Sequence, residues 1–255
     1  MASVSAFSPA DFHREFSAAA RAAGFAVEPF GEVAGCPLIA CTKPASDQRP
    51  RIYLSAGIHG DEPAPPRALL RLLQRRFFDD RCGWFLCPLL NPTGMAAGTR
   101  ENFERRDLNR EYRSAQAPET RAHVAWLKRQ PPFDLTLCLH EDWESSGFYL
   151  YELNPDHRPS LAEPMVTAVS RVCPLDLAPT IDGRPAQGGI IRPDDDPAKR
   201  ELWPEAIYLR AHHTRLSYTL ESPSARPLPQ RLRAHVTAIR TAVACLRHYP
   251  PPRSA

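Results

Sequence analysis

The chain has 255 residues, of which 43% are hydrophobic and 24% are charged, a composition typical of a water-soluble globular protein with one substantial core. Its formal net charge of +3 is small and its arginines are scattered, which argues against a nucleic-acid-binding protein. The sequence also lacks a signal-peptide pattern and any apolar run near the roughly 20 residues of a membrane span. We therefore expect a cytoplasmic protein with neither a nucleic-acid nor a membrane partner.

The cysteines predict reduced thiols. Their number is odd, no Cys-x-x-Cys pair occurs, and most of them lie in apolar runs that indicate the core. This pattern favours buried thiols over disulfides or a thiolate zinc site. The residues are Cys36, Cys41, Cys82, Cys87, Cys138, Cys173 and Cys245.

Elements in the first part of the chain are predicted from the spacing of apolar residues and from turn residues between the runs. They are, in order, a helix over 11–23, strands over 25–33, 37–42 and 51–56, a helix over 63–77, and a strand over 83–88 that ends in a turn at 89–94. The strand over 25–33 is expected at an edge of the sheet. Between the strand over 51–56 and the next helix, Gly57 and Gly60 permit a sharp turn.

The second part of the chain begins with a long irregular section, which in a compact domain usually has a function. The elements are, in order, this arginine-rich section over 95–114, a helix over 119–129, strands over 134–139 and 148–152, a helix over 161–173, a loop-like section over 178–203, a helix over 205–212, a strand over 216–220 and a helix over 229–248. The loop-like section is expected to form a rim over a pocket.

Strands that alternate with helices along the whole chain indicate the α/β class. We predict one domain over residues 1–250, with a mostly parallel or mixed twisted sheet and helices on both faces, and a disordered tail at 251–255. In such a sheet, ligands collect at the carboxyl ends of the strands.

A histidine and a carboxylate lie on the turn that follows the strand over 51–56. His59 and Glu62 are three residues apart, a spacing that suits two ligands of one metal ion. The alternative is a helix N-terminus with an acidic residue that the helix dipole favours. His140 directly follows a buried strand, where a third ligand is expected, although a core histidine fits the same pattern. The residues alone leave both interpretations open.

Four motifs follow one another along the chain: His59-x-x-Glu62, Arg100 with Asp107-Leu108-Asn109-Arg110, His140 after a buried strand, and Glu221 after the last strand. In this order they together resemble the M14 metallocarboxypeptidase family, including its short bacterial branches and the related aspartoacylase and succinylglutamate desuccinylase group. The resemblance covers roughly residues 50 to 225.

The resemblance implies a zinc site. His59, Glu62 and His140 would hold one zinc ion and leave one coordination position open. Glu221 would act as the general base on a water molecule and return the proton to the leaving amine. A surface carboxylate at a strand end is the alternative for Glu221.

The resemblance also implies how the substrate is held. Arg110 would grip a substrate carboxylate through two hydrogen bonds, and Asn109 would add a donor. Arg100 would stabilise the oxyanion of the transition state. Asp107 is expected to brace the loop, while Arg105 and Arg106 are expected to be solvated.

The chain departs from the family at a tyrosine. Large carboxypeptidases carry one in a mobile loop some twenty residues before the catalytic glutamate, and none lies at that distance here. Tyr149, Tyr151 or Tyr208 could line the pocket instead, and each is as readily a core residue. Glu141 and Asp142 are candidates for orienting the ligand imidazoles.

The function implied is a zinc-dependent hydrolase that cleaves an amide bond beside a free carboxylate, most simply a carboxypeptidase on short peptides. A deacylase of N-acyl amino acids or a murein-peptide amidase could use the same site. A metal-free module that binds carboxylates or peptides is a third reading, although it would have no need for Glu221. The expected partner is a small peptide or an acyl amino acid, and the sequence leaves the oligomeric state open.

Overall fold

The computed structural model describes residues 7–44, 46, 49–194 and 196–246, so the tail predicted at 251–255 lies outside the described residues. Within these residues ten strands form one sheet in the order β1-β2-β4-β3-β5-β10-β6-β9-β8-β7. The strands are β1 (Ala26–Val33), β2 (Cys36–Lys43), β3 (Arg51–Ala56), β4 (Gly83–Cys87), β5 (Leu135–Asp142), β6 (Tyr149–Leu153), β7 (Thr180–Ile181), β8 (Arg184–Gln187), β9 (Ile190–Ile191) and β10 (Ser217–Pro223).

The sheet is mixed, with a parallel centre. Strand β3 pairs in parallel with β4 and β5, and β5 pairs in parallel with β10. These strands are almost wholly buried, as expected for parallel strands that are covered on both faces. The flanks start with antiparallel partners, β2 beside β4 and β6 beside β10, and β1 forms one edge as predicted.

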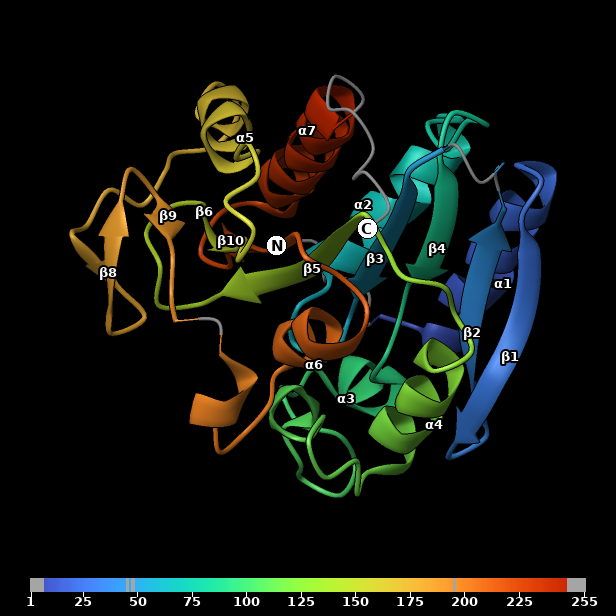
Figure 1. Ribbon diagram of the computed structural model, residues 1–255. Helices are drawn as coiled ribbons and strands as arrows, with labels where there is room; N and C mark the ends of the chain where they lie inside the picture. Colours follow the sequence, from blue (N-terminus) through green and yellow to red (C-terminus); the bar gives the residue numbers. More distant parts are fainter. Residues whose placement is uncertain (1–6, 45, 47–48, 195, 247–255) are drawn as a thin grey trace.

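Helices cover both faces of the sheet, so the predicted fold class is confirmed (Figure 1). One face packs against α1 (Pro9–Ala22), α2 (Ala64–Gln74), α5 (Ala162–Val169) and α7 (Leu228–Leu246), whose apolar residues share one core cluster. The other face packs against α4 (Pro118–Leu127) and α6 (Glu205–His212), which contribute to a second cluster. Along β5, Leu137 belongs to the first cluster and Cys138 to the second, because successive side chains of a strand point to opposite faces.

Two irregular sections of the prediction contain regular structure. The turn predicted at 89–94 includes the start of helix α3 (Pro92–Ala97), where the Asn91 side chain accepts a hydrogen bond from the Gly94 amide at 2.8 Å. The loop predicted at 178–203 holds β7, β8 and β9, of which β9 pairs with β6. Strands of two to four residues are too short to show an alternation of apolar and polar residues in the sequence. They form because they pair with neighbouring strands.

The cysteines agree with the prediction of free thiols, since all seven are unpaired and five of them are buried. In the parts of the chain that are described, no helix combines the length and the apolarity that a membrane crossing requires.

Candidate metal centre and active site

The residues predicted for the site meet at the carboxyl ends of the central strands. His140 is the third residue from the carboxyl end of β5. It pairs with Glu221 in the register of β5 with β10. His59 follows the end of β3, the other neighbour of β5. The parallel order of these strands therefore brings together side chains that lie far apart in the sequence.

The turn that carries His59 and Glu62 is closely packed. Gly57 has a φ of +64°, which side chains rarely adopt. A Cβ atom on Gly60 would lie 1.9 Å from the carbonyl carbon of Gly94 at helix α3. The Gly60 amide also donates to the Arg100 carbonyl at 3.3 Å. The glycines thus let the ligand turn contact the segment that carries Arg100.

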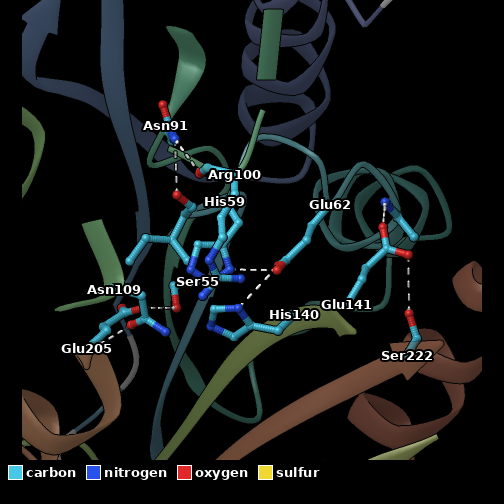
Figure 2. Close-up of polar contacts among 12 residues, drawn as sticks. Ser55, His59, Glu62, Asn91, Arg100, Asn109, His140, Glu141, Glu205 and Ser222 are labelled. Atoms are coloured by element: carbon cyan, nitrogen blue, oxygen red, sulfur yellow. Dashed lines mark hydrogen bonds and ion pairs between the residues drawn. The ribbon is translucent and has the colours of Figure 1, made fainter. Parts of the chain in front are cut away.

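The candidate metal ligands form a buried cluster (Figure 2). The Oε1 atom of Glu62 is 2.5 Å from His59 Nδ1, and its Oε2 atom is 3.1 Å from His140 Nδ1. One ligand atom from each residue lies within 4.8 Å of the others, and all three side chains are buried. A carboxylate buried between two imidazole nitrogens matches the nitrogen and oxygen donor set that zinc prefers.

Asp107 orients His59. Its Oδ1 atom is 3.2 Å from His59 Nε2 and accepts from the Asn109 amide at 2.9 Å, while Arg100 Nε donates to Oδ2 at 3.1 Å. In the neutral imidazole that a metal ion would bind, a proton on Nε2 donated to this carboxylate would leave the lone pair on Nδ1, the nitrogen that faces Glu62. The loop-bracing role predicted for Asp107 agrees with these contacts, and the contact with His59 is additional.

The prediction that Glu141 and Asp142 orient the imidazoles was wrong. The carboxylate of Glu141 bonds the Ala64 amide and the Arg231 guanidinium, and that of Asp142 accepts from the Tyr149 hydroxyl at 2.9 Å. Glu141 follows His140 in a strand, so its side chain points to the opposite face of the sheet.

Charges within the site alter the pKa values of its groups. Burial would raise the pKa of Glu62, but His59 and His140 outweigh it and lower the pKa to about 2. Burial would lower the pKa of His59, but the Glu62 and Asp107 carboxylates raise it to about 9. For Glu221, burial raises the pKa to about 8, although His140 opposes the shift.

A cavity of about 380 Å³ contains the whole predicted site. Its lining includes every residue that the sequence proposed for metal binding, catalysis and substrate binding: His59, Glu62, Arg100, Asn109, Arg110, His140 and Glu221. Tyr149 and Tyr151 of β6 also line it, whereas Tyr208 packs in the second core cluster.

Asn109 is held through its side-chain oxygen, and no residue in the described part of the chain accepts a hydrogen bond from its amide NH₂ group. Its Oδ1 atom accepts from the Glu205 amide at 2.9 Å. The Glu205 side chain is buried and accepts hydrogen bonds from the Tyr53 hydroxyl at 2.7 Å and from the Ser55 hydroxyl at 2.8 Å, and Figure 2 shows Ser55 next to Glu205. These contacts tie the start of α6 to β3. No sequence pattern singles out Glu205, because an acidic residue in the first turn of a helix is common.

Comparisons with known proteins identify related sequences and structures. The succinylglutamate desuccinylase/aspartoacylase catalytic domain matches residues 48–177. Carboxypeptidase D of Anas platyrhynchos is 33% identical over a match of 153 residues, with 44% of this chain and only 11% of that protein covered.

Solved structures share the fold over nearly the whole chain. A candidate metallopeptidase from Shewanella amazonensis is 25% identical, with 92% of each chain covered and a TM-score of 0.79. One from Shewanella baltica is 24% identical, covers 92% of this chain and 91% of its own, and has a TM-score of 0.81. A metallo-carboxypeptidase from Pseudomonas aeruginosa, in complex with (2-guanidinoethylmercapto)succinic acid, is 19% identical over 92% of this chain and 68% of its own, with a TM-score of 0.68.

Proposed function

Because this chain belongs to the succinylglutamate desuccinylase/aspartoacylase catalytic domain family, we propose that it is a zinc-dependent hydrolase that cleaves an amide bond beside a free carboxylate. Its simplest form is a metallocarboxypeptidase that acts on short peptides. The observation that carries the proposal is the buried cluster of His59, Glu62 and His140 in one cavity with Glu221.

The metal site is the first part of the proposal. A zinc ion held by His59, Glu62 and His140 would polarise the amide carbonyl and lower the pKa of water. The donor set fits zinc because two imidazole nitrogens and one carboxylate leave one position of a tetrahedron for substrate or water. Asp107 supports it by fixing the tautomer of His59.

Glu221 is the proposed general base. It takes a proton from the attacking water and gives it to the leaving amine. Two observations support this role: Glu221 pairs with His140 in the register of β5 with β10, and it lines the same cavity. Burial raises the pKa of Glu221 to about 8, close to the range suited to a group that first accepts and then returns a proton.

The arginines are the proposed electrostatic partners of the substrate. Arg110 and the free amide of Asn109 bind the carboxylate next to the scissile bond. Arg100 is held by two contacts with Asp107, from Nε at 3.1 Å and from Nη2 at 3.0 Å, and it stabilises the oxyanion. A charge fixed in this way needs little reorganisation during the reaction.

One observation favours a peptidase over a deacylase of small acyl groups. Trp143 and Leu202 line the cavity but remain 74% and 56% exposed, which leaves an apolar rim for a larger group on the substrate. We therefore expect peptides, or amino acids with a large apolar acyl group, to be better substrates than acetyl or succinyl amino acids.

The cytoplasmic location remains a prediction from the sequence.

The test combines metal analysis with a substrate screen. Purified protein should contain close to one zinc per chain and should hydrolyse members of a panel of short peptides, murein peptides and N-acyl amino acids. Glu221→Gln should keep the zinc and lose about a thousandfold or more in kcat, because the base is removed and the ligands remain. Turnover retained in this variant excludes the mechanism, and peptide binding without any turnover in the wild type favours a binding module.

A further inference from the structure

Glu141 is a buried carboxylate that the proposed reaction does not use. Its side chain is 0% exposed, and it lies on the face of the sheet that packs against α2 and α7. His140, its neighbour in β5, points to the cavity on the other face. Burying a carboxylate costs free energy unless hydrogen bonds or an opposite charge compensate it. The partners of Glu141, the residue next to a candidate metal ligand, therefore indicate its role.

One oxygen of Glu141 connects the strand that carries His140 to the segment that carries Glu62. Oε1 accepts from the Ala64 amide at 2.7 Å (Figure 2). Ala64 is the first residue of α2 and lies two residues after Glu62, and no side chain caps this helix from Pro63. Glu141 therefore supplies the missing helix cap from another strand, and it joins the segment of Glu62 to the strand of His140.

The other oxygen of Glu141 faces β10, the strand that carries Glu221, and helix α7. Oε2 accepts from Arg231 of α7, whose side chain is only 14% exposed, and the Ser222 hydroxyl lies 3.5 Å away. Ser222 follows Glu221 in β10, and its hydroxyl is 3.0 Å from Nε2 of His235 in α7. The segment that carries Glu62, the strand that carries His140 and the strand that carries the proposed base thus meet at one carboxylate.

We propose that Glu141 is a positioning residue that holds Glu62 against His140 at the separation that the metal needs. Arg231 serves as its counter-ion. Stability alone does not explain the pair, because buried ion pairs can often be replaced by apolar residues without loss. Metal ligands, in contrast, have to be held within about 0.5 Å of their geometry by the residues around them. This inference rests on the proposed metal site.

The test measures zinc affinity separately from activity. Metal-stripped protein is titrated with Zn²⁺ in competition with a chromophoric chelator, and its thermal midpoint without metal is recorded. The double variant Glu141→Met with Arg231→Met removes the tether and leaves no unpaired charge. We expect its zinc dissociation constant to rise about 10- to 100-fold, while the midpoint of the stripped protein changes by no more than about 4 °C.

A matched control uses another buried carboxylate with an arginine partner. Glu152 in β6 accepts hydrogen bonds from Arg192 Nε at 2.6 Å and from the Tyr218 hydroxyl at 2.8 Å, and neither partner belongs to the segments of His59, Glu62 or His140. Glu152→Met with Arg192→Met should change the zinc dissociation constant less than about twofold, because the pair shares no hydrogen-bond partner with the metal ligands.

The outcomes separate this inference from the proposed function. A tether variant that binds zinc within about threefold of the wild type overturns the inference. If the double variant does not fold, Glu141→Asp keeps the partner of Arg231 but shortens the reach to Ala64, and wild-type zinc affinity in that variant overturns the inference too. A wild-type protein that binds no zinc contradicts the proposed function itself.

Discussion

Asp107 is predicted to orient a metal ligand, and Asp107→Asn tests this. Its carboxylate lies 3.2 Å from His59 Nε2 and 3.1 Å from Arg100 Nε. Burial would raise the pKa of Asp107, but His59 and Arg100 lower it further, so the group is ionised at neutral pH. An asparagine keeps the size of the side chain and removes the charge that both partners face.

The magnitude follows from the contact with His59. Loss of an outer partner of a metal ligand typically weakens metal binding about 10- to 100-fold, or about 1.4 to 2.7 kcal/mol. The Asp107 side chain is 24% exposed, so water can replace part of the lost contact. We therefore expect a loss near the lower end, about tenfold in zinc affinity. The catalytic constant should fall as well, because Arg100 loses its anchor.

The assay is zinc competition with a chelator, together with kcat on the best substrate of the panel. Asp142→Asn is the control, since Asp142 also lines the cavity but bonds Tyr149 rather than an imidazole. Zinc affinity that falls as far in Asp142→Asn as in Asp107→Asn would refute the assignment of the orienting carboxylate to Asp107.

Three further predictions concern the clamp, the ligand turn and a buried histidine. Arg110→Ala should raise KM about tenfold or more with a smaller effect on kcat, whereas Arg121→Ala on the exposed side of α4 should change neither; equal KM effects contradict the clamp. Gly60→Ala should lower the free energy of unfolding by about 2 kcal/mol, because its Cβ would meet Gly94, and urea denaturation that shows no loss would contradict this packing. Burial lowers the pKa of His13 to about 4, so its stabilising contribution is complete above pH 6.5 and declines as the pH falls toward 4. Between pH 7 and pH 4, the free energy of unfolding of His13→Leu should therefore fall by about 3 kcal/mol less than that of the wild type in urea titrations. An equal decrease in both proteins would contradict this prediction.

Much of the architecture was predicted because neighbouring residues encode it. The apolar run before His140 and the helical spacing over 205–212 gave elements that the structure reproduces closely. Where the local signal was short or mixed, the prediction failed. The helix predicted over 161–173 ends at Val169, and three short strands lie where a loop was expected.

The candidate site shows the same division. Residue types and spacing marked His59, Glu62 and His140 as possible metal ligands, and the family resemblance joined them with Glu221 into one site. His140 and Glu221, which were expected just after their strands, lie within the last three residues of β5 and β10. Local sequence patterns do not reveal the order of the strands in the sheet. That order places these four residues in one cavity.

The sequence by itself determined which residues can carry the chemistry, because ligand types, spacing and strand ends are local properties. Only the tertiary structure decided their supporting partners. Asp107 reaches His59 across 48 residues, and Glu141 reaches Ala64 across 77. Such contacts depend on strand order and on the face of the sheet to which each side chain points, and neither is set by the residues next to it in the chain.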